Sequence, residues 1–260
     1  MSSYESFAAF YDELTTNVDY ETRGAYLWQI LQNEGKRSGL LLDLACGTGT
    51  LCEYFSARGY DVIGVDASED MLAEAMEKKI EAQSDTLYLC QRMQDLDLFG
   101  TVDVVLCTLD SLNHITDKDE LAGVFERIAL FLNEDARVVF DVNTVYKHEE
   151  VLQNNTFVYD LDDIYCVWQN TLQLDHVVDI TLDLFAYDEE NDCYDRTQES
   201  FSERAYTEEE LRQMIEAAGM TVLARYAELS FDAPTPTTER VVYVLKNVVC
   251  KNQKPLPELE

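Results

Sequence analysis

The sequence predicts an α/β protein built on a doubly wound sheet whose strands are mostly parallel. Three observations predict this fold class. Short apolar runs alternate with amphipathic stretches from residue 20 to residue 142. The first apolar run, at 40–44, leads through a turn with two glycines into a helix-like segment. The pattern then changes over 156–204 to alternation with a period of two. Strands that alternate with helices form parallel sheets with right-handed crossovers, whereas period-two stretches form antiparallel strands.

The first part of the chain is expected to supply the parallel strands and most of the helices. Apolar runs predict strands at 40–44, 60–66, 86–90, 102–107 and 137–142. Helical periodicity predicts helices at 4–16, 20–32, 50–58, 68–82 and 117–132. Ser68 is a suitable N-cap for the fourth of these helices, and Gly59 is a suitable stop for the third.

The second part of the chain is expected to add a cap and to complete the sheet. Aromatic alternation over 156–204, broken by acidic turns, predicts three or four antiparallel strands. A helix over 207–218 follows, with Thr207 as its cap. Strands at 221–230 and 239–247 complete the sheet, the last one antiparallel. We therefore predict one domain from 1–150 and 205–250, an inserted β cap at 151–204 and a flexible tail at 251–260.

The charge of the chain argues against two classes of partner. The sequence has 19 Lys and Arg against 51 Asp and Glu, a formal net charge of −32. Such a surface repels a phosphate backbone and an anionic membrane, so neither nucleic acid nor membrane is an expected partner. The N-terminus has no apolar signal-peptide core, and no run approaches the ~18 apolar residues of a membrane span. A cytoplasmic location is the expectation.

The seven cysteines are scattered and include no C-x-x-C pair. Several lie in or beside apolar runs that are expected to be strands. This distribution favours buried, reduced thiols over a disulfide framework or a zinc site, and no metal is expected.

The turn Asp43-Leu-Ala-Cys-Gly-Thr-Gly49 is the strongest functional signal. Glycines between a strand and a helix let a ligand approach the backbone closely. A dinucleotide fingerprint requires a third glycine three residues after the second, where this chain has Cys52. A nicotinamide-dependent oxidoreductase is therefore the poorer alternative.

This turn resembles the acidic-x-Gly-x-Gly-x-Gly turn of the class I S-adenosylmethionine-dependent methyltransferases, with Ala45 in place of the first glycine. The resemblance covers nearly the whole chain and is strongest to the methyltransferase-domain-25 type. It implies a Rossmann-like domain that binds S-adenosylmethionine and moves a methyl group to an N, O or S of a small molecule. A cofactor-binding regulatory module without catalysis remains an alternative.

The resemblance also implies contacts with the cofactor. Asp43 would face its ammonium group, and Asp66 would accept hydrogen bonds from both ribose hydroxyls, although Asp66 is also a reasonable helix N-cap. Arg92 stands where the family usually has an adenine-binding acid, and a guanidinium cannot accept those hydrogen bonds. The other implied contacts are Tyr11 in a lid segment, Ala45, Cys46, Gly47 and Gly49 in the turn, and Ala67, Met71, Met93, Thr108, Leu109 and Asn113.

The sequence also contains candidates for the acceptor side. Asp110 and His114 follow the fourth strand at the carboxyl edge of the sheet, where such folds bind ligands. Tyr165 and Trp168 from the cap are further candidates, since aromatic rings can enclose a cationic amine. His114 could equally be a polar loop residue, and the aromatic residues could be core. No catalytic base or oligomeric state is assigned.

Overall fold

The computed structural model describes residues 19–161, 163–189 and 191–248. Its larger sheet contains β1 (Gly39–Leu44), β2 (Tyr60–Asp66), β3 (Leu87–Cys90), β4 (Val102–Cys107), β5 (Leu132–Asn143), β10 (Met220–Ala227) and β11 (Arg240–Asn247). The strand order is β10-β11-β5-β4-β1-β2-β3, in which β11 runs opposite to the other six strands. The predicted fold class is confirmed.

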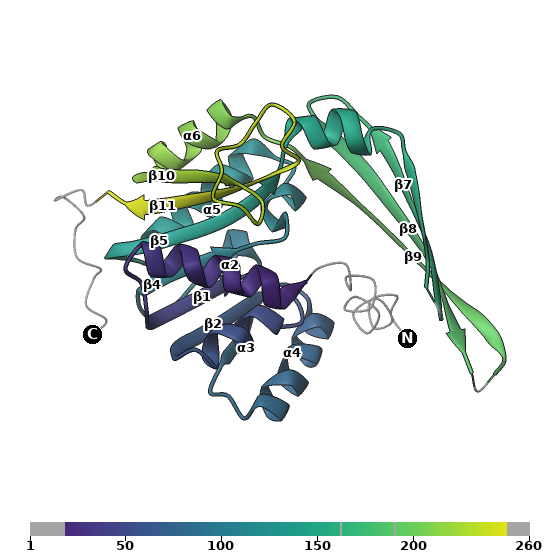
Figure 1. Ribbon diagram of the computed structural model, residues 1–260, viewed down its shortest axis with the longest axis horizontal. Helices are drawn as coiled ribbons and strands as arrows, with labels where there is room; N and C mark the ends of the chain where they lie inside the picture. Colours follow the sequence, from purple (N-terminus) through teal and green to yellow (C-terminus); the bar gives the residue numbers. More distant parts are fainter. Residues whose placement is uncertain (1–18, 162, 190, 249–260) are drawn as a thin grey trace.

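Helices cover both faces of this sheet (Figure 1). On one face, α2 (Tyr20–Asn33) and α3 (Thr50–Ser56) bury their apolar sides, with α4 (Glu69–Ala82) beside α3. On the other face lie α5 (Lys118–Leu130) and α6 (Glu208–Ala217). Ser68 and Thr207 cap α4 and α6 as predicted, and Thr207 forms a full capping box with Glu210. Within the described part of the chain, none of the helices combines the length and apolarity needed to cross a bilayer.

The second sheet projects from one end of this body (Figure 1). It consists of β6 (Thr156–Asp160), β7 (Ile164–Leu172), β8 (Val177–Asp188) and β9 (Cys193–Arg204), all antiparallel. We call these four strands the arm. A short π-helical segment, η3 (Lys147–Leu152), leads into it from β5. The division of the sequence into a body and an inserted cap remains a prediction, which the separate sheet supports.

One face of the arm is apolar near the body. Leu152 of η3 packs there against Val178 and Ile180, and Phe157, Trp168, Leu172, Leu182 and Phe201 surround them. Because side chains alternate between the two faces of a strand, Glu203 lies on this face two residues beyond Phe201. We call this surface the inner face of the arm.

Some element boundaries differ from the prediction. β5 starts at Leu132 instead of 137, because Leu132 pairs with Val102 across an irregular register despite the polar residues that follow it. β10 ends at Ala227, before Leu229 takes a left-handed backbone conformation. The predicted helix at 4–16 and the tail at 251–260 lie outside the described residues.

Candidate active site

The turns after four neighbouring strands meet at one edge of the larger sheet. β2, β1, β4 and β5 are adjacent and parallel, so their carboxyl ends share that edge. Asp43 of β1 lies opposite Leu106 of β4, so the turn after β4 begins beside the glycine turn. Open α/β sheets bind ligands at such an edge.

The glycine turn has three residues in the left-handed region. They are Ala45 (φ 60°), Gly47 (φ 53°) and Gly49 (φ 75°). A Cβ at Gly49 would collide with Tyr88 and Ala75, so packing as well as conformation requires glycine there. A Cβ at Gly47 would meet no atom within 4 Å. Gly47 therefore faces open space, where a ligand can approach the backbone.

Asp66 is anchored by the backbone on both oxygens. Its Oδ2 accepts a hydrogen bond from the Gly47 N–H at 2.8 Å, and its Oδ1 accepts one from the Ser68 N–H at 2.9 Å. The N-cap of α4 is Ser68 and not Asp66, so the alternative role for Asp66 is wrong. Each carboxylate oxygen keeps a further lone pair, which suits a ligand with two adjacent hydroxyls. Ala67 is exposed and Met71 half-buried just beyond it.

Asp43 is a buried acid at the foot of the glycine turn. Its Oδ2 lies 3.3 Å from the Cys52 Sγ, and the side chain of Cys46 is close to both. Burial raises the pKa of Asp43 to about 7, the hydrogen bond from Cys52 opposes this rise, and the negative charge of Asp66 adds to it. A cation next to Asp43 would favour the carboxylate.

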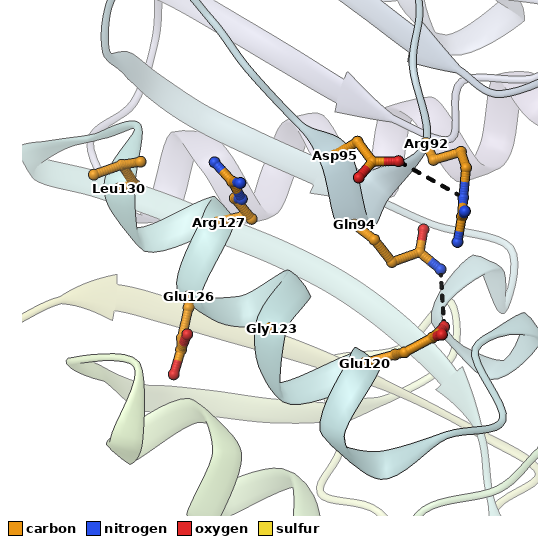
Figure 2. A pocket seen from close by; sticks show the side chains of 8 residues that line it. All are labelled: Arg92, Gln94, Asp95, Glu120, Gly123, Glu126, Arg127 and Leu130. Atoms are coloured by element: carbon orange, nitrogen blue, oxygen red, sulfur yellow. Dashed lines mark hydrogen bonds and ion pairs between the residues drawn. The ribbon is translucent and has the colours of Figure 1, made fainter.

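The region after β3 contains Arg92 and Met93, the residues predicted to meet the adenine. Arg92 is exposed, and its Nε lies 3.9 Å from Asp95 Oδ2. Arg92 and Asp95 border a depression of about 640 Å³ between the short helix η1 (Met93–Asp95) and α5 (Figure 2). Gln94 and Glu120 meet across it at 3.3 Å. None of the glycine-turn residues lines this depression, so we do not place the cofactor in it, and the two adenine contacts remain predictions.

The turn after β4 is held in a strained conformation. Leu109 and Asp110 both have positive φ, 59° and 52°, which non-glycine residues rarely adopt. The buried carboxylate of Asp141 accepts both of their N–H groups, at 2.9 and 2.8 Å. Arg23 and Arg240 each place a guanidinium 3.5 Å from Asp141. Strain of this kind persists where the surroundings fix it, which is common at ligand sites.

Asp110 presents an ionised carboxylate at this edge. Its Oδ2 accepts hydrogen bonds from Arg240 Nη2 at 3.1 Å and from Asn143 Nδ2 at 2.5 Å. Burial opposes ionisation, but the positive charges of Arg240 and Lys147 outweigh it and lower the pKa of Asp110. Thr108, just before it, is buried.

Asn113 ties the body to the arm. Its Oδ1 accepts the Asn143 N–H, and its Nδ2 donates to the carbonyls of Asn143 and Arg204 at 3.2 and 2.8 Å. The side-chain amide of Asn113 thus bonds to both the N–H and the C=O of Asn143, as the backbone of a neighbouring strand would. Asn113 is completely buried, so none of its atoms is accessible for the predicted contact with the cofactor.

His114 lies between the body and the arm. It ends the short helix η2 (Ser111–His114), and its side chain is 46% exposed. Its ring packs on Phe201 with 5.0 Å between centroids, and its Nε2 lies 3.8 Å from Glu203 Oε1. His114 is therefore placed where an acceptor between η2 and the inner face would meet it.

Tyr165 and Trp168 lie on opposite faces of β7, because three residues separate them. Trp168 packs on the inner face against Phe157, and its Nε1 donates to Asn170. Tyr165 is 40% exposed and contacts Phe185 on the outer face. The expectation that both rings enclose one acceptor is therefore corrected, and Trp168, on the inner face, remains a predicted acceptor-side residue.

Several residues of this edge escaped the sequence analysis. Asp141 and Asn143 end the fifth strand, and the rule that ligands bind at carboxyl ends of strands could have drawn attention to them. Glu203 occupies an inward position of an alternating strand, where a buried acid is unusual. Tyr11 lies outside the described residues. The six cysteines that the structure describes are free thiols, and no group of three metal-ligating side chains occurs among the described residues.

The residues at the glycine turn fit S-adenosylmethionine, the cofactor that the resemblance implies. The open space over Gly47 admits a ligand, and the free lone pairs of Asp66 match a ribose diol. The buried acid Asp43 matches an ammonium group.

Comparisons with known proteins agree with this geometry. The methyltransferase domain family matches residues 41–135. An inferred methyltransferase of Geobacillus sp. (strain WCH70) is 34% identical over 247 residues, covering 94% of this chain and 99% of that protein.

Solved structures show the same likeness. A crystal structure of an S-adenosylmethionine-dependent methyltransferase from Clostridium acetobutylicum ATCC 824 is 31% identical, with a TM-score of 0.86, and the match covers 95% of this chain and 99% of that one. The sugar N-methyltransferase KedS8 from Streptoalloteichus sp. ATCC 53650 shares the fold at 21% identity and a TM-score of 0.74, over 90% of this chain and 92% of that one. The glycine turn thus serves a methyltransferase and not a nicotinamide-dependent oxidoreductase. The chain belongs to the class I S-adenosylmethionine-dependent methyltransferases, and S-adenosylmethionine is its cofactor.

Proposed function

We propose that the enzyme methylates an N, O or S atom of a small molecule held between η2 and the inner face of the arm. One observation carries the proposal. Asp110 and His114 of the body and Glu203 of the arm converge at the carboxyl edge of the sheet, where the turn after β4 begins beside the glycine turn. The sheet positions the first two, and β9 brings the third from a distant part of the sequence.

The roles of the side chains follow from their surroundings. Asp43 would pair with the ammonium group of the cofactor, and Asp66 would bind its ribose hydroxyls. The bound cofactor supplies a methyl group on a positively charged sulfur, which is already activated toward attack. The protein has then to orient the acceptor and exclude water, and needs a proton acceptor only where the acceptor carries a proton. His114 is the half-exposed imidazole at the right edge, and the ionised Asp110 can accept a hydrogen bond from the acceptor.

The class of acceptor is supported by charge and by the comparison with KedS8. The net charge of −32 disfavours nucleic acid. KedS8, which shares the fold, is named as an N-methyltransferase of a sugar, a small molecule with hydroxyl and amino groups. Carboxylates at Asp110 and Glu203 complement such groups.

The first test measures binding of S-adenosylhomocysteine by calorimetry. Asp66→Ala is expected to weaken binding by about 1.5–3 kcal/mol through loss of charge-assisted hydrogen bonds. Glu69→Ala is the matched control, because Glu69 is exposed in the first turn of α4. Unchanged affinity in Asp66→Ala would refute the ribose assignment.

The second test follows labelled methyl groups from S-adenosylmethionine to mixtures of small amines, hydroxyl compounds, carboxylates and thiols. Label in a small molecule supports the proposal. Binding of S-adenosylhomocysteine without transfer to any of these classes would favour the regulatory module instead.

A further inference from the structure

The inner face of the arm is acidic and aromatic. Side chains alternate along β9, so Glu199, Phe201 and Glu203 point inward. The two arginines of this strand, Arg196 and Arg204, take outward positions. All inward positions of the four strands belong to the described residues, and none of them holds a lysine or an arginine. This face is therefore complementary to a positively charged group.

Glu199 differs from Glu203 in its lack of a partner. Glu203 accepts a hydrogen bond from Asn143 Nδ2 at 3.1 Å. Glu199 is half-buried, and its Oε1 is buried without any hydrogen-bond partner among the described residues. Burial raises the pKa of the Glu199 carboxyl, and a neighbouring positive charge would lower that pKa again. A buried oxygen without a partner costs stability, and a ligand that pairs with it removes this cost.

Aromatic rings share this face with Glu199. Phe157, Trp168, Leu182 and Glu199 lie side by side across the four strands. Neighbouring strands are ~4.8 Å apart, so the backbones of Trp168 and Glu199 are ~10 Å apart, with Leu182 between them. An ammonium group over Leu182 would meet the indole on one side and the carboxylate on the other. Cations bind to the faces of aromatic rings, most strongly to tryptophan, and a carboxylate adds an opposite charge.

This position is separate from the edge where the methyl group is transferred. The His114 ring packs on Phe201, with 5.0 Å between the ring centroids. Glu199 lies two residues before Phe201 on β9, which places it ~7 Å farther from the body. A group held by Glu199 is thus not the atom that is methylated beside His114.

We propose that Glu199 and Trp168 form a cation site, which binds an ammonium or substituted ammonium group of the acceptor while another atom of the same molecule takes the methyl group. The proposal rests on the proposed function and deepens it. The acceptor is narrowed to a small molecule with a positive charge at one end and a nucleophilic N, O or S atom at the other.

The first test is NMR of the labelled indole N–H groups in the full chain saturated with S-adenosylhomocysteine. The chain has two tryptophans, and Trp28→Phe assigns their signals. The probes are choline, a quaternary ammonium ion, and its neutral analogue in which a carbon atom replaces the nitrogen.

We expect choline to shift the Trp168 signal and to bind about tenfold more tightly than the neutral analogue. The Trp28 signal is the internal control, because Trp28 lies on α2. An unmoved Trp168 signal, or equal affinities for the two probes, would overturn the proposal.

Glu199→Gln removes the charge and keeps the size of the side chain. We expect it to bind choline about tenfold more weakly than the wild type and the neutral analogue equally well. Asp160→Asn is the matched control, since Asp160 is an exposed acid on the outer face of β6. Equal choline affinities in the wild type and Glu199→Gln would contradict the proposal.

Glu199→Met distinguishes a binding role from a structural one. Methionine has a similar length and no group that must be hydrogen-bonded, so we expect the urea midpoint to rise while choline binding is lost. A lower midpoint with choline binding retained would show that Glu199 stabilises the fold and does not bind a cation. If neither variant folds, the comparison of the two probes on the wild type still decides.

The transfer of labelled methyl groups distinguishes failure of this proposal from failure of the proposed function. Label found only in small molecules without a positive charge, together with an unmoved Trp168 signal, would refute the cation site and leave the proposed function standing. A choline response of Trp168 without transfer to any small molecule would refute the proposed function and leave the cation site standing.

Discussion

The cofactor side and the acceptor side of this site are built in opposite ways. The predicted cofactor side is centred on one continuous stretch of chain, from Asp43 to Met71, and much of that stretch is backbone held by hydrogen bonds such as that between Gly47 and Asp66. The acceptor side uses side chains from η2, β5, η3, β9 and β11, and a network of charges holds them.

This difference separates what is shared in the family from what can vary. A backbone turn tolerates few substitutions, because left-handed residues and close packing fix its shape. A network of side chains from distant elements can change its members while the sheet stays the same. We therefore expect the cofactor to be common to relatives of this enzyme and the acceptor to differ among them.

Asp141→Ala should have the largest effect, because Asp141 joins the two sides. The change removes the fully buried carboxylate that Arg23 and Arg240 share, so that only the less buried Asp110 and Glu228 still face them, and it frees the strained N–H groups of Leu109 and Asp110. We expect the free energy of unfolding in urea to fall by about 3–5 kcal/mol. Asp61→Ala, at an exposed position of β2, is the control and should change it by less than about 0.5 kcal/mol. Similar losses in both variants would show that the network does not hold the acceptor edge.

Asp43→Asn should have a smaller effect that depends on pH. The folded-state pKa of about 7 lies above the ordinary value near 4, so folding keeps Asp43 protonated between these two values. The unfolded chain releases that proton, and the wild type therefore loses stability as pH rises from about 4 to about 7, by up to about 4 kcal/mol at 1.4 kcal/mol per unit.

Asparagine does not ionise, so the stability of Asp43→Asn relative to wild type should increase over that range and level off above pH 7. Thermal unfolding of both proteins between pH 4.5 and 8 measures the difference. Parallel curves would mean that Asp43 ionises normally. The same variant should bind S-adenosylhomocysteine less tightly. Asp43 would then lower the stability of the wild type at neutral pH and at the same time contribute to cofactor binding.

Ala45→Gly should have the smallest effect, and it should stabilise. Ala45 has a φ of 60°, where a Cβ costs about 1–2 kcal/mol, and glycine loses about 0.5–1 kcal/mol of that gain through its greater freedom in the unfolded chain. We expect a net gain of about 0.5–1 kcal/mol in urea unfolding. Ala57→Gly, at a right-handed φ of −62°, is the control and should destabilise by about 0.5–1 kcal/mol. A loss of stability in Ala45→Gly would show that the turn is not strained.

The sequence predicted the sheet, the helix caps and the glycine turn because each depends on neighbouring residues. An apolar run, a Ser or Thr cap and a glycine with positive φ all act within a few positions. The contact between Asn143 and Glu203, which are 60 positions apart in the sequence, depends instead on how the arm is oriented on the body. No local pattern contains that information.

The error at Tyr165 and Trp168 has a different cause. Side chains on a strand alternate, so residues three apart face opposite ways, and the spacing alone excluded a shared ring cage. Aromatic type alone does not show which face of a strand a ring occupies, whereas the strand period does. The boundary error at β5, like the meeting of Asn143 with Glu203, arises from a contact between residues far apart in the sequence, since Leu132 joins the sheet through its partner Val102.

The hydrogen bonds of Asp66 also bear on how fast the cofactor exchanges. Both oxygens of that carboxylate accept hydrogen bonds from the backbone of Gly47 and Ser68, so the side chain has little rotamer freedom to lose when a ligand binds. A preorganised group adds affinity without a slow rearrangement step. We expect association at this end of the site to be limited by diffusion and charge, without a slow rearrangement of Asp66.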